Sequence, residues 1–80
     1  MRYTVVWTDA ALSELARVWM QAADPAAVRA ASDEIDRQLA RDPETQGVEF
    51  YGDRLLVITP LHATFAVRLD DREVVVLNVW

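Results

Sequence analysis

The stretch Arg54–Trp80, RLLVITPLHATFAVRLDDREVVVLNVW, decides the fold. It contains three apolar runs of strand length that are rich in β-branched and aromatic residues: 55–59, 64–69 and 73–80. Pro60 closes the first run and Asp70-Asp71 closes the second, and both are turn signals. The three runs are therefore predicted to form an antiparallel meander. Alternate residues of the second run should face the core: Phe65, Val67 and Leu69.

The residues before this stretch predict one strand and a helical hairpin. Residues 2–7 alternate like a strand, and Thr8 is an N-cap for a helix that runs to about Ala22. Asp24-Pro25 starts a second helix that ends near Arg41, so about two residues connect two antiparallel helices. Apolar positions at helical spacing are predicted to face the sheet: Leu12, Leu15, Ala16 and Trp19 in the first helix, and Val28, Ala31, Ile35 and Leu39 in the second.

These elements predict a two-layer α+β domain that spans residues 1–80. Residues 43–53 are predicted to be a loop, so the order is strand, helix, helix and three strands. If the chain direction alternates at every step, residues 2–7 pair antiparallel with residues 73–79. The prediction is thus a helical hairpin packed on one face of a four-stranded antiparallel sheet.

Composition and charge limit the classes of function. The 80 residues carry a formal net charge of -5, and this acidic balance lowers the expectation of nucleic-acid binding, because affinity for the phosphate backbone comes from neutralising it with Lys and Arg. All eight basic residues are Arg. There is no Cys, no metal-ligand spacing and no Gly-rich phosphate loop, so we expect no metal or cofactor. We find no signal peptide and no run near the roughly 18 apolar residues of a membrane span, and we expect a cytoplasmic protein.

Several short patterns resemble one protein family. Residues 3–7, YTVVW, followed by residues 10–15, AALSEL, are similar to the opening strand and A-x-x-D/E-L helix of that family. Residues 35–43, IDRQLARDP, are similar to its I-x-x-L-x-x-x-P pattern, and residues 65–71, FAVRLDD, to its Y-x-V-x-x-D-x pattern. With Gly47 and Arg54, the chain resembles the RelE/ParE superfamily of bacterial toxins along essentially its whole length. The resemblance implies a toxin-like component of a type II toxin–antitoxin module, acting mainly by protein binding and neutralised by an antitoxin.

The alternative function is a ribosome-dependent mRNA endoribonuclease of RelE type. For that reaction Arg54 and His62 are the catalytic candidates, Tyr51 is a further proton-transfer candidate, and Arg54, Arg68 and Arg72 would bind RNA phosphate if they converge. The simpler interpretation places His62 as a solvated turn residue and the arginines as exposed strand residues. Ribonuclease members carry an Arg with a Tyr or His after the final strand, and this sequence, which ends at Trp80, has no match. We therefore expect little or no ribonuclease activity.

Three residues are candidates for partner binding: Trp80, Val79 and Tyr51. A Trp at the end of an apolar strand is difficult to cover with two short helices, so an exposed apolar surface is expected there. The resemblance implies an antitoxin segment as its partner, bound as a helix or a strand. The sequence is also compatible with a homodimer, with a DNA gyrase poison that acts by protein contact, and with a non-toxic binding module of the same fold.

Overall fold

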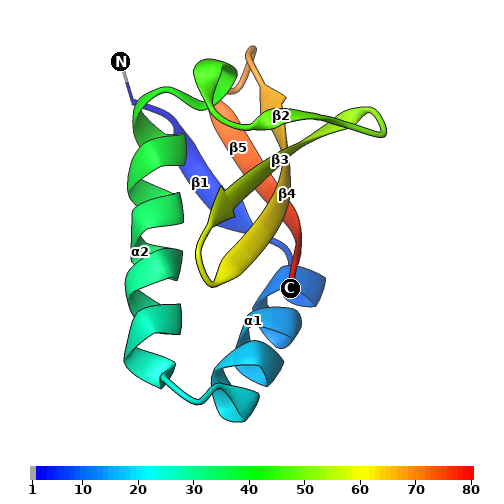
Figure 1. Ribbon diagram of the computed structural model, residues 1–80. Helices are drawn as coiled ribbons and strands as arrows, with labels where there is room; N and C mark the ends of the chain where they lie inside the picture. The colour runs from blue at the N-terminus through cyan, green and yellow to red at the C-terminus, as the bar shows by residue number, and fades with distance from the viewer. Residues whose placement is uncertain (1) are drawn as a thin grey trace.

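The computed structural model describes residues 2–80 as two helices on a five-stranded mixed sheet (Figure 1). Its elements are β1 (Thr4–Trp7), α1 (Asp9–Gln21), α2 (Pro25–Arg41), the short 3-10 helix η1 (Pro43–Thr45), β2 (Val48–Phe50), β3 (Asp53–Ile58), β4 (Leu61–Arg68) and β5 (Glu73–Val79). The strand order is β1-β5-β4-β3-β2. The two-layer α+β class, the helical hairpin and the C-terminal meander are confirmed. The strand count and one strand direction were predicted wrongly.

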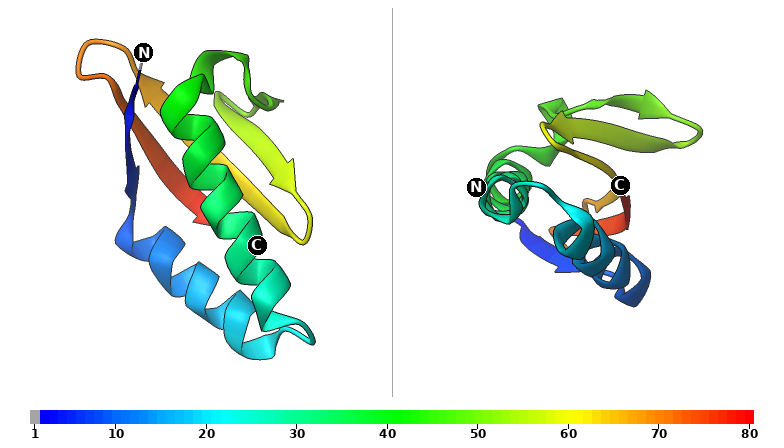
Figure 2. Two further views of the ribbon diagram at one scale, coloured as in Figure 1. Left: turned by 90° about the vertical axis from the view of Figure 1, so that its left-hand side faces the viewer. Right: turned by 60° about the horizontal axis from the view of Figure 1, so that its bottom comes forward.

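The N-terminal strand pairs with β5, as expected, but in the parallel direction. Only Thr8 separates β1 from α1, and one residue cannot turn the chain back. Helix α1 therefore continues roughly along the direction of β1, and the reversal comes only between α1 and α2 (Figure 2, left). The assumption that the chain direction alternates at every step failed at this connection.

The fifth strand lies within the predicted loop. Val48–Phe50 pairs antiparallel with β3, and only Tyr51 and Gly52 connect the two strands. Both connecting residues have positive φ, 50° and 88°, as in a type I′ hairpin turn. Tyr-Gly is not one of the usual dipeptides for this turn, and for that reason the sequence did not indicate a hairpin.

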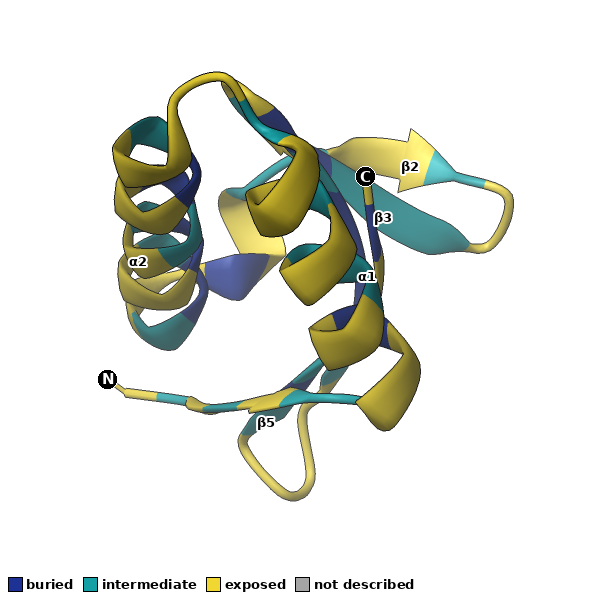
Figure 3. Cartoon of the chain, turned by 90° about the horizontal axis from the view of Figure 1, so that it is seen from below, coloured by how far each residue is buried: buried dark blue, intermediate teal, exposed yellow. Residues whose placement is uncertain are grey.

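Helix α2 packs on the sheet through the predicted stripe. Its residues Val28, Ala31, Ile35 and Leu39 are all buried. They meet buried residues of the sheet that come from β3, β4 and β5: Leu56, Leu61, Ala63, Phe65, Val74, Val76 and Val79. Viewed from below, the buried residues line the inner sides of the helices and the sheet (Figure 3). Asp24 caps α2 by accepting a hydrogen bond from the Ala27 backbone N–H, as predicted.

Helix α1 is rotated from the predicted orientation. Leu12 and Trp19 are each 50% exposed and Ala16 is exposed, so the predicted stripe is wrong except for Leu15. The stripe that packs on the core is Ala11, Leu15, Val18 and Ala22. Both stripes are apolar and helically spaced, so periodicity alone does not distinguish them. The small Ala11 is fully buried and donates to the Thr8 cap, whose hydroxyl also bonds to Leu77 of β5. In β4, Leu69 is likewise exposed, because the strand ends at Arg68.

We predict that Ile35→Ala destabilises the fold by about 2–5 kcal/mol, because the truncation leaves a cavity between α2 and the sheet. Trp19→Ala removes a larger but half-exposed side chain and should cost less. Urea unfolding of both variants tests this ordering. An Ile35→Ala midpoint equal to that of the unsubstituted chain would contradict the packing.

Candidate functional site: the outer face of the sheet and the hairpin groove

The strand register assigns the side chains of the sheet to two faces. Residues directly opposite one another on neighbouring strands share a face. Val48 lies opposite Leu55, Val57 lies opposite His62, and His62 pairs with Trp80. Their β3 neighbours Arg54 and Leu56 point to the helix side, opposite Phe65 and Ala63. We call the side away from the helices the outer face, and it carries Val48, Phe50, Leu55, Val57, His62 and Trp80.

An aromatic cluster covers part of the outer face. The His62 and Trp80 rings are stacked, with centroids 5.4 Å apart and planes 6° apart. Phe50 lies 6.3 Å from Trp80, and Tyr51 meets Phe50 edge-on at 4.8 Å. The Trp80 backbone is fixed by two hydrogen bonds, from His62 N to Trp80 O at 2.7 Å and from Trp80 N to His62 O at 3.0 Å. The cluster is therefore held by the sheet, although Trp80 remains 46% exposed.

The candidate partner-binding residues do not all lie on the surface. Val79 is 2% exposed and lies opposite the buried Ala63, so its side chain is not available to a partner. Trp80 is on the outer face, and Tyr51 is 92% exposed at the tip of the β2–β3 hairpin. Two of the three candidates are thus placed where a partner can contact them.

His62 lies in β4, and its predicted place in a turn is wrong. Its imidazole stacks on Trp80 and lies in the row formed by Val57, His62 and Trp80 across the sheet. The stacking covers one face of the ring. The arrangement gives His62 an apolar, aromatic environment on the outer face.

Arg54 holds the loop before β2. Its Nε donates to the Gln46 carbonyl at 2.9 Å and its Nη2 to the Gly47 carbonyl at 3.0 Å. Gly47 has φ 71°, and a Cβ there would clash with the Leu55 carbonyl oxygen, so the loop requires glycine at this position. Arg54 is partly buried on the helix side of β3, and two of its donors are used within the fold.

The other two candidate arginines lie at the C-terminal end of β4 and in the turn that follows it. Arg68 is on the outer face, opposite Glu73, with 4.0 Å between the charged groups. Arg72 is in the β4–β5 turn, where its guanidinium lies 5.6 Å from the centroid of the Tyr3 ring. Arg54 and Arg68 point to opposite faces of the sheet. The structure therefore does not assemble the three arginines into one phosphate site.

Tyr3 ties β1 to the segment after α2. Its hydroxyl donates to Glu44 Oε1 at 3.0 Å. This hydrogen bond, together with partial burial and the negative charge of Glu44, raises the pKa of the Tyr3 phenol above its ordinary value of 10.0. The protonated phenol is the form that the folded state stabilises.

A second apolar surface lies between the two helices and was not found from the sequence. Seven residues line a groove of about 280 Å³: Leu12, Leu15, Ala16, Trp19, Val28, Arg29 and Ser32. The residues wrongly assigned to the core of α1 form one wall of this groove. The helical hairpin extends beyond the end of the sheet, so the sheet does not cover this part of it (Figure 1). We call this surface the hairpin groove.

Within residues 2–80, no helix is long and apolar enough to cross a membrane. The same residues include no group of three or more His, Asp or Glu side chains placed to hold a metal ion.

The fold is shared with chains of two solved toxin–antitoxin structures. A chain of the toxin–antitoxin complex RelBE2 from Mycobacterium tuberculosis has a TM-score of 0.79 and 19% identity, over 100% of this chain and 91% of that chain. A chain of the chromosomal ParDE TA system from P. aeruginosa has a TM-score of 0.65 and 21% identity, over 98% and 94% of the two chains. No family model matches the sequence, and no curated protein is significantly similar to it. The predicted resemblance is confirmed at the level of the fold.

We predict that the Tyr3–Glu44 hydrogen bond makes stability depend on alkaline pH. A phenol whose pKa is raised by folding stabilises the fold below about pH 10, and this contribution is lost as pH rises through the folded-state pKa. Urea unfolding at a series of pH values should show this loss, and Tyr3→Phe should remove it. Tyr51→Phe is the matched control, because that phenol is exposed. An identical alkaline slope in Tyr3→Phe would show that another group is responsible.

Proposed function

We propose that this chain is the toxin-like component of a type II toxin–antitoxin module, acting mainly by protein binding in the cytoplasm and neutralised by an antitoxin. The observation that carries the proposal is a fold shared along the whole chain with a chain of a toxin–antitoxin complex, at a TM-score of 0.79. Two exposed apolar surfaces, the outer face and the hairpin groove, support binding as the mode of action.

The hairpin groove is the surface that best fits an antitoxin segment. Its walls are side chains of two helices, which offer no free backbone edge for an added strand. An amphipathic helix with apolar anchors at i, i+3 or i+4 and i+7 fits such a groove. Leu12 and Trp19 are two turns apart on α1, so the groove extends along the helix far enough to receive more than one such anchor. Arg29, the one charged residue that lines the groove, favours a segment with an acidic residue at that point.

The ribonuclease alternative has less support from the site. Cleavage by attack of a 2′-hydroxyl needs a base, an acid and stabilisation of negative charge on the phosphate. Here Arg54 is engaged with loop carbonyls, Arg68 faces Glu73, and His62 is stacked on Trp80. The proposal has three variants: a toxin that binds the ribosome, a toxin that binds DNA gyrase, and a binding module that has lost toxicity. Expression in cells separates the non-toxic module from the two toxins.

Expression of the chain in bacterial cells should arrest growth, and co-expression of its cognate antitoxin should restore growth. The antitoxin should bind the purified chain. Leu12→Glu and Trp19→Glu should each weaken that binding by about a hundredfold or more, because a buried unpaired charge costs several kcal/mol. Leu69→Glu is the matched control, since Leu69 is exposed in the β4–β5 turn. Binding without growth arrest would identify a non-toxic module.

In a translating bacterial extract, the purified chain should produce no new mRNA ends by primer extension. The net charge of -5 repels RNA, and the structure does not group the candidate arginines. Cleavage within codons that is lost in His62→Asn, with the variant folded as judged by circular dichroism, would overturn this expectation and establish the ribonuclease alternative.

A further inference from the structure

We propose that the outer face carries a binding site for the guanidinium group of an arginine side chain that a protein partner presents. The site lies between the rings of Phe50 and Trp80, above Thr64. It is separate from the hairpin groove. The inference goes beyond the proposed function, because it depends neither on toxicity nor on the antitoxin segment in that groove.

The first observation is a buried hydroxyl group without a partner. Thr64 is 5% exposed, and its Oγ1 has no hydrogen-bond partner among residues 2–80. The strand register places its side chain on the outer face, since it lies opposite Leu55 of β3 and Asn78 of β5. A buried hydroxyl that forms no hydrogen bond destabilises the state that contains it, and a ligand that supplies a partner recovers this free energy.

The second observation is a pair of aromatic side chains that approach each other over the outer face. Phe50 belongs to β2 and Trp80 follows β5, and the strand order places β3 and β4 between them. With neighbouring strands about 4.8 Å apart, the two backbones are separated by roughly 14 Å. The ring centroids are only 6.3 Å apart, so both side chains lean toward each other across β3 and β4. The ring planes are 37° apart, so the rings are tilted and not closely stacked.

The Thr64 hydroxyl group lies beneath this pair of rings. Along β3, one ring is aligned with Asp53 and the other with Val57. Leu55 is midway between these two residues, and it lies opposite Thr64. The rings therefore cover the position of Thr64, which accounts for its burial. A planar group that enters between the tilted rings reaches the Oγ1 atom.

The polar atoms around this position call for a hydrogen-bond donor. Asn78 lies opposite Thr64, and its amide nitrogen is 3.4 Å from both carboxylate oxygens of Glu14, which leaves the amide oxygen as an acceptor. Asp53 is on the outer face beside Phe50, and no ion pair within residues 2–80 includes its carboxylate. A threonine hydroxyl also accepts hydrogen bonds. The ligand that fits best therefore carries several donors.

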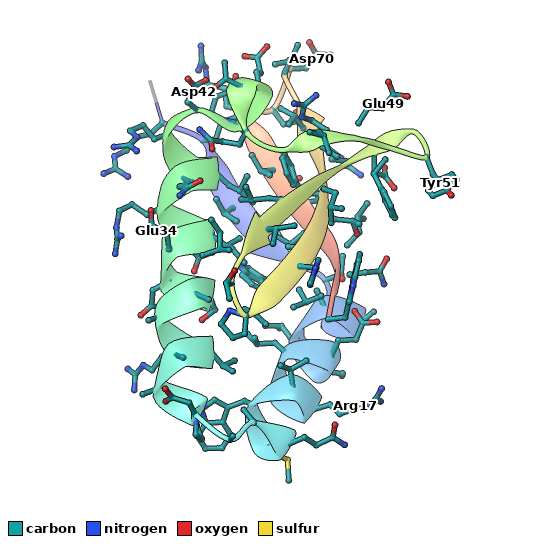
Figure 4. The ribbon with its side chains drawn as sticks, viewed as in Figure 1. Arg17, Glu34, Asp42, Glu49, Tyr51 and Asp70 are labelled. Atoms are coloured by element: carbon teal, nitrogen blue, oxygen red, sulfur yellow. The ribbon has the colours of Figure 1, made fainter. Side chains whose placement is uncertain are left out.

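The charges of the outer face favour a cation. The strands place three charged residues on it, and two of them, Arg68 and Glu73, lie opposite each other with 4.0 Å between the charged groups. The third is Asp53, whose charge is left uncompensated on this face. Glu49 adds a second negative charge to the same hairpin (Figure 4), and residues 48–53 contain no basic residue. Arg54 follows them, but it lies on the helix side and donates to two loop carbonyls.

A guanidinium group meets all of these requirements. It is planar and charged, it carries five N–H donors, and it stacks on aromatic rings. An ammonium group is also attracted to aromatic rings, but it is not planar and fits less well between two of them. Exposed apolar residues flank the rings, with Val48 63% and Val57 49% exposed. A free guanidinium compound would leave them uncovered, whereas an arginine with apolar neighbours in a protein covers them.

An NMR titration of the isotope-labelled chain with a capped Val-Arg-Val peptide tests the site. The indole N–H signal of Trp80 should shift. Those of Trp7, which donates to Asp36, and Trp19, which lines the hairpin groove, should not. The same peptide with citrulline in place of arginine has the same shape without the charge, and it should bind at least about fivefold more weakly. Capped arginine alone should bind more weakly than the peptide by a similar factor, because it lacks the apolar contacts.

Thr64→Val removes the hydroxyl group and keeps the shape of the side chain. Its free energy of unfolding should stay equal or rise, because a buried unpaired group is lost, while the dissociation constant of the peptide should rise about tenfold. A merely structural role of Thr64 would not change the two quantities in this way. Trp80→Leu should weaken binding as well. Thr4→Val is the matched control, since Thr4 is exposed on the outer face of β1, away from the rings, and it should leave binding unchanged.

The proposal is overturned by a Trp80 signal that does not move, by equal binding of the arginine and citrulline peptides, or by undiminished binding to Thr64→Val. A shift of the Trp19 signal in place of that of Trp80 overturns it too, because the peptide would then occupy the hairpin groove. Capped arginine that binds as tightly as the peptide overturns the assignment to a protein partner. None of these results depends on growth arrest or on the antitoxin, so the proposed function stands or fails separately.

Discussion

The short connection at Thr8 is the constraint on which the rest of the fold depends. Its backbone N–H donates to Val76 O at 3.1 Å, and its hydroxyl donates to Leu77 O at 3.2 Å and accepts from the Ala11 N–H at 3.0 Å. One residue thus ends β1, caps α1 and binds β5. Because the chain cannot reverse here, β1 runs parallel to β5 and α1 continues beyond the end of the sheet. The uncovered part of the helical hairpin, with its apolar groove, follows from this connection.

A second local feature decides which residues at the end of β5 reach the surface. The β4–β5 register shifts between Thr64 and Phe65, which lie opposite Asn78 and Val76. In a regular strand, residues 74, 76, 78 and 80 would all point to the helix side. The bulge adds one residue to β5, so the residues after it point to the opposite faces. Val79 is therefore buried and Trp80 exposed. Glu14 on α1 stabilises this geometry by accepting hydrogen bonds from the Val79 N–H at 3.0 Å and from Asn78 at 3.4 Å.

The sequence predicted features that depend on local chemistry. The Thr8 and Asp24 caps, the α2 stripe and the three C-terminal strands each rest on a few neighbouring residues with a strong preference. The prediction from sequence failed where two possible arrangements had similar local signals. Both stripes of α1 are apolar, Tyr51-Gly52 is an uncommon hairpin turn, and the bulge that separates Val79 from Trp80 exists only through pairing with β4. The engagement of Arg54 with the Gln46 and Gly47 carbonyls depends on a loop whose path no short pattern fixes.

The position of Arg54 also shows why the shared fold does not transfer chemistry. The resemblance matches it to a family arginine, yet its Nε and one terminal nitrogen close the loop before β2, and the side chain lies on the helix side of β3. The outer face carries valine, leucine and aromatic side chains, with Arg68 opposite Glu73 at one end. Such a surface gains free energy by excluding water, whereas RNA binding gains it by neutralising phosphates. The chemistry of this face therefore favours a protein partner even where the backbone would accommodate either ligand.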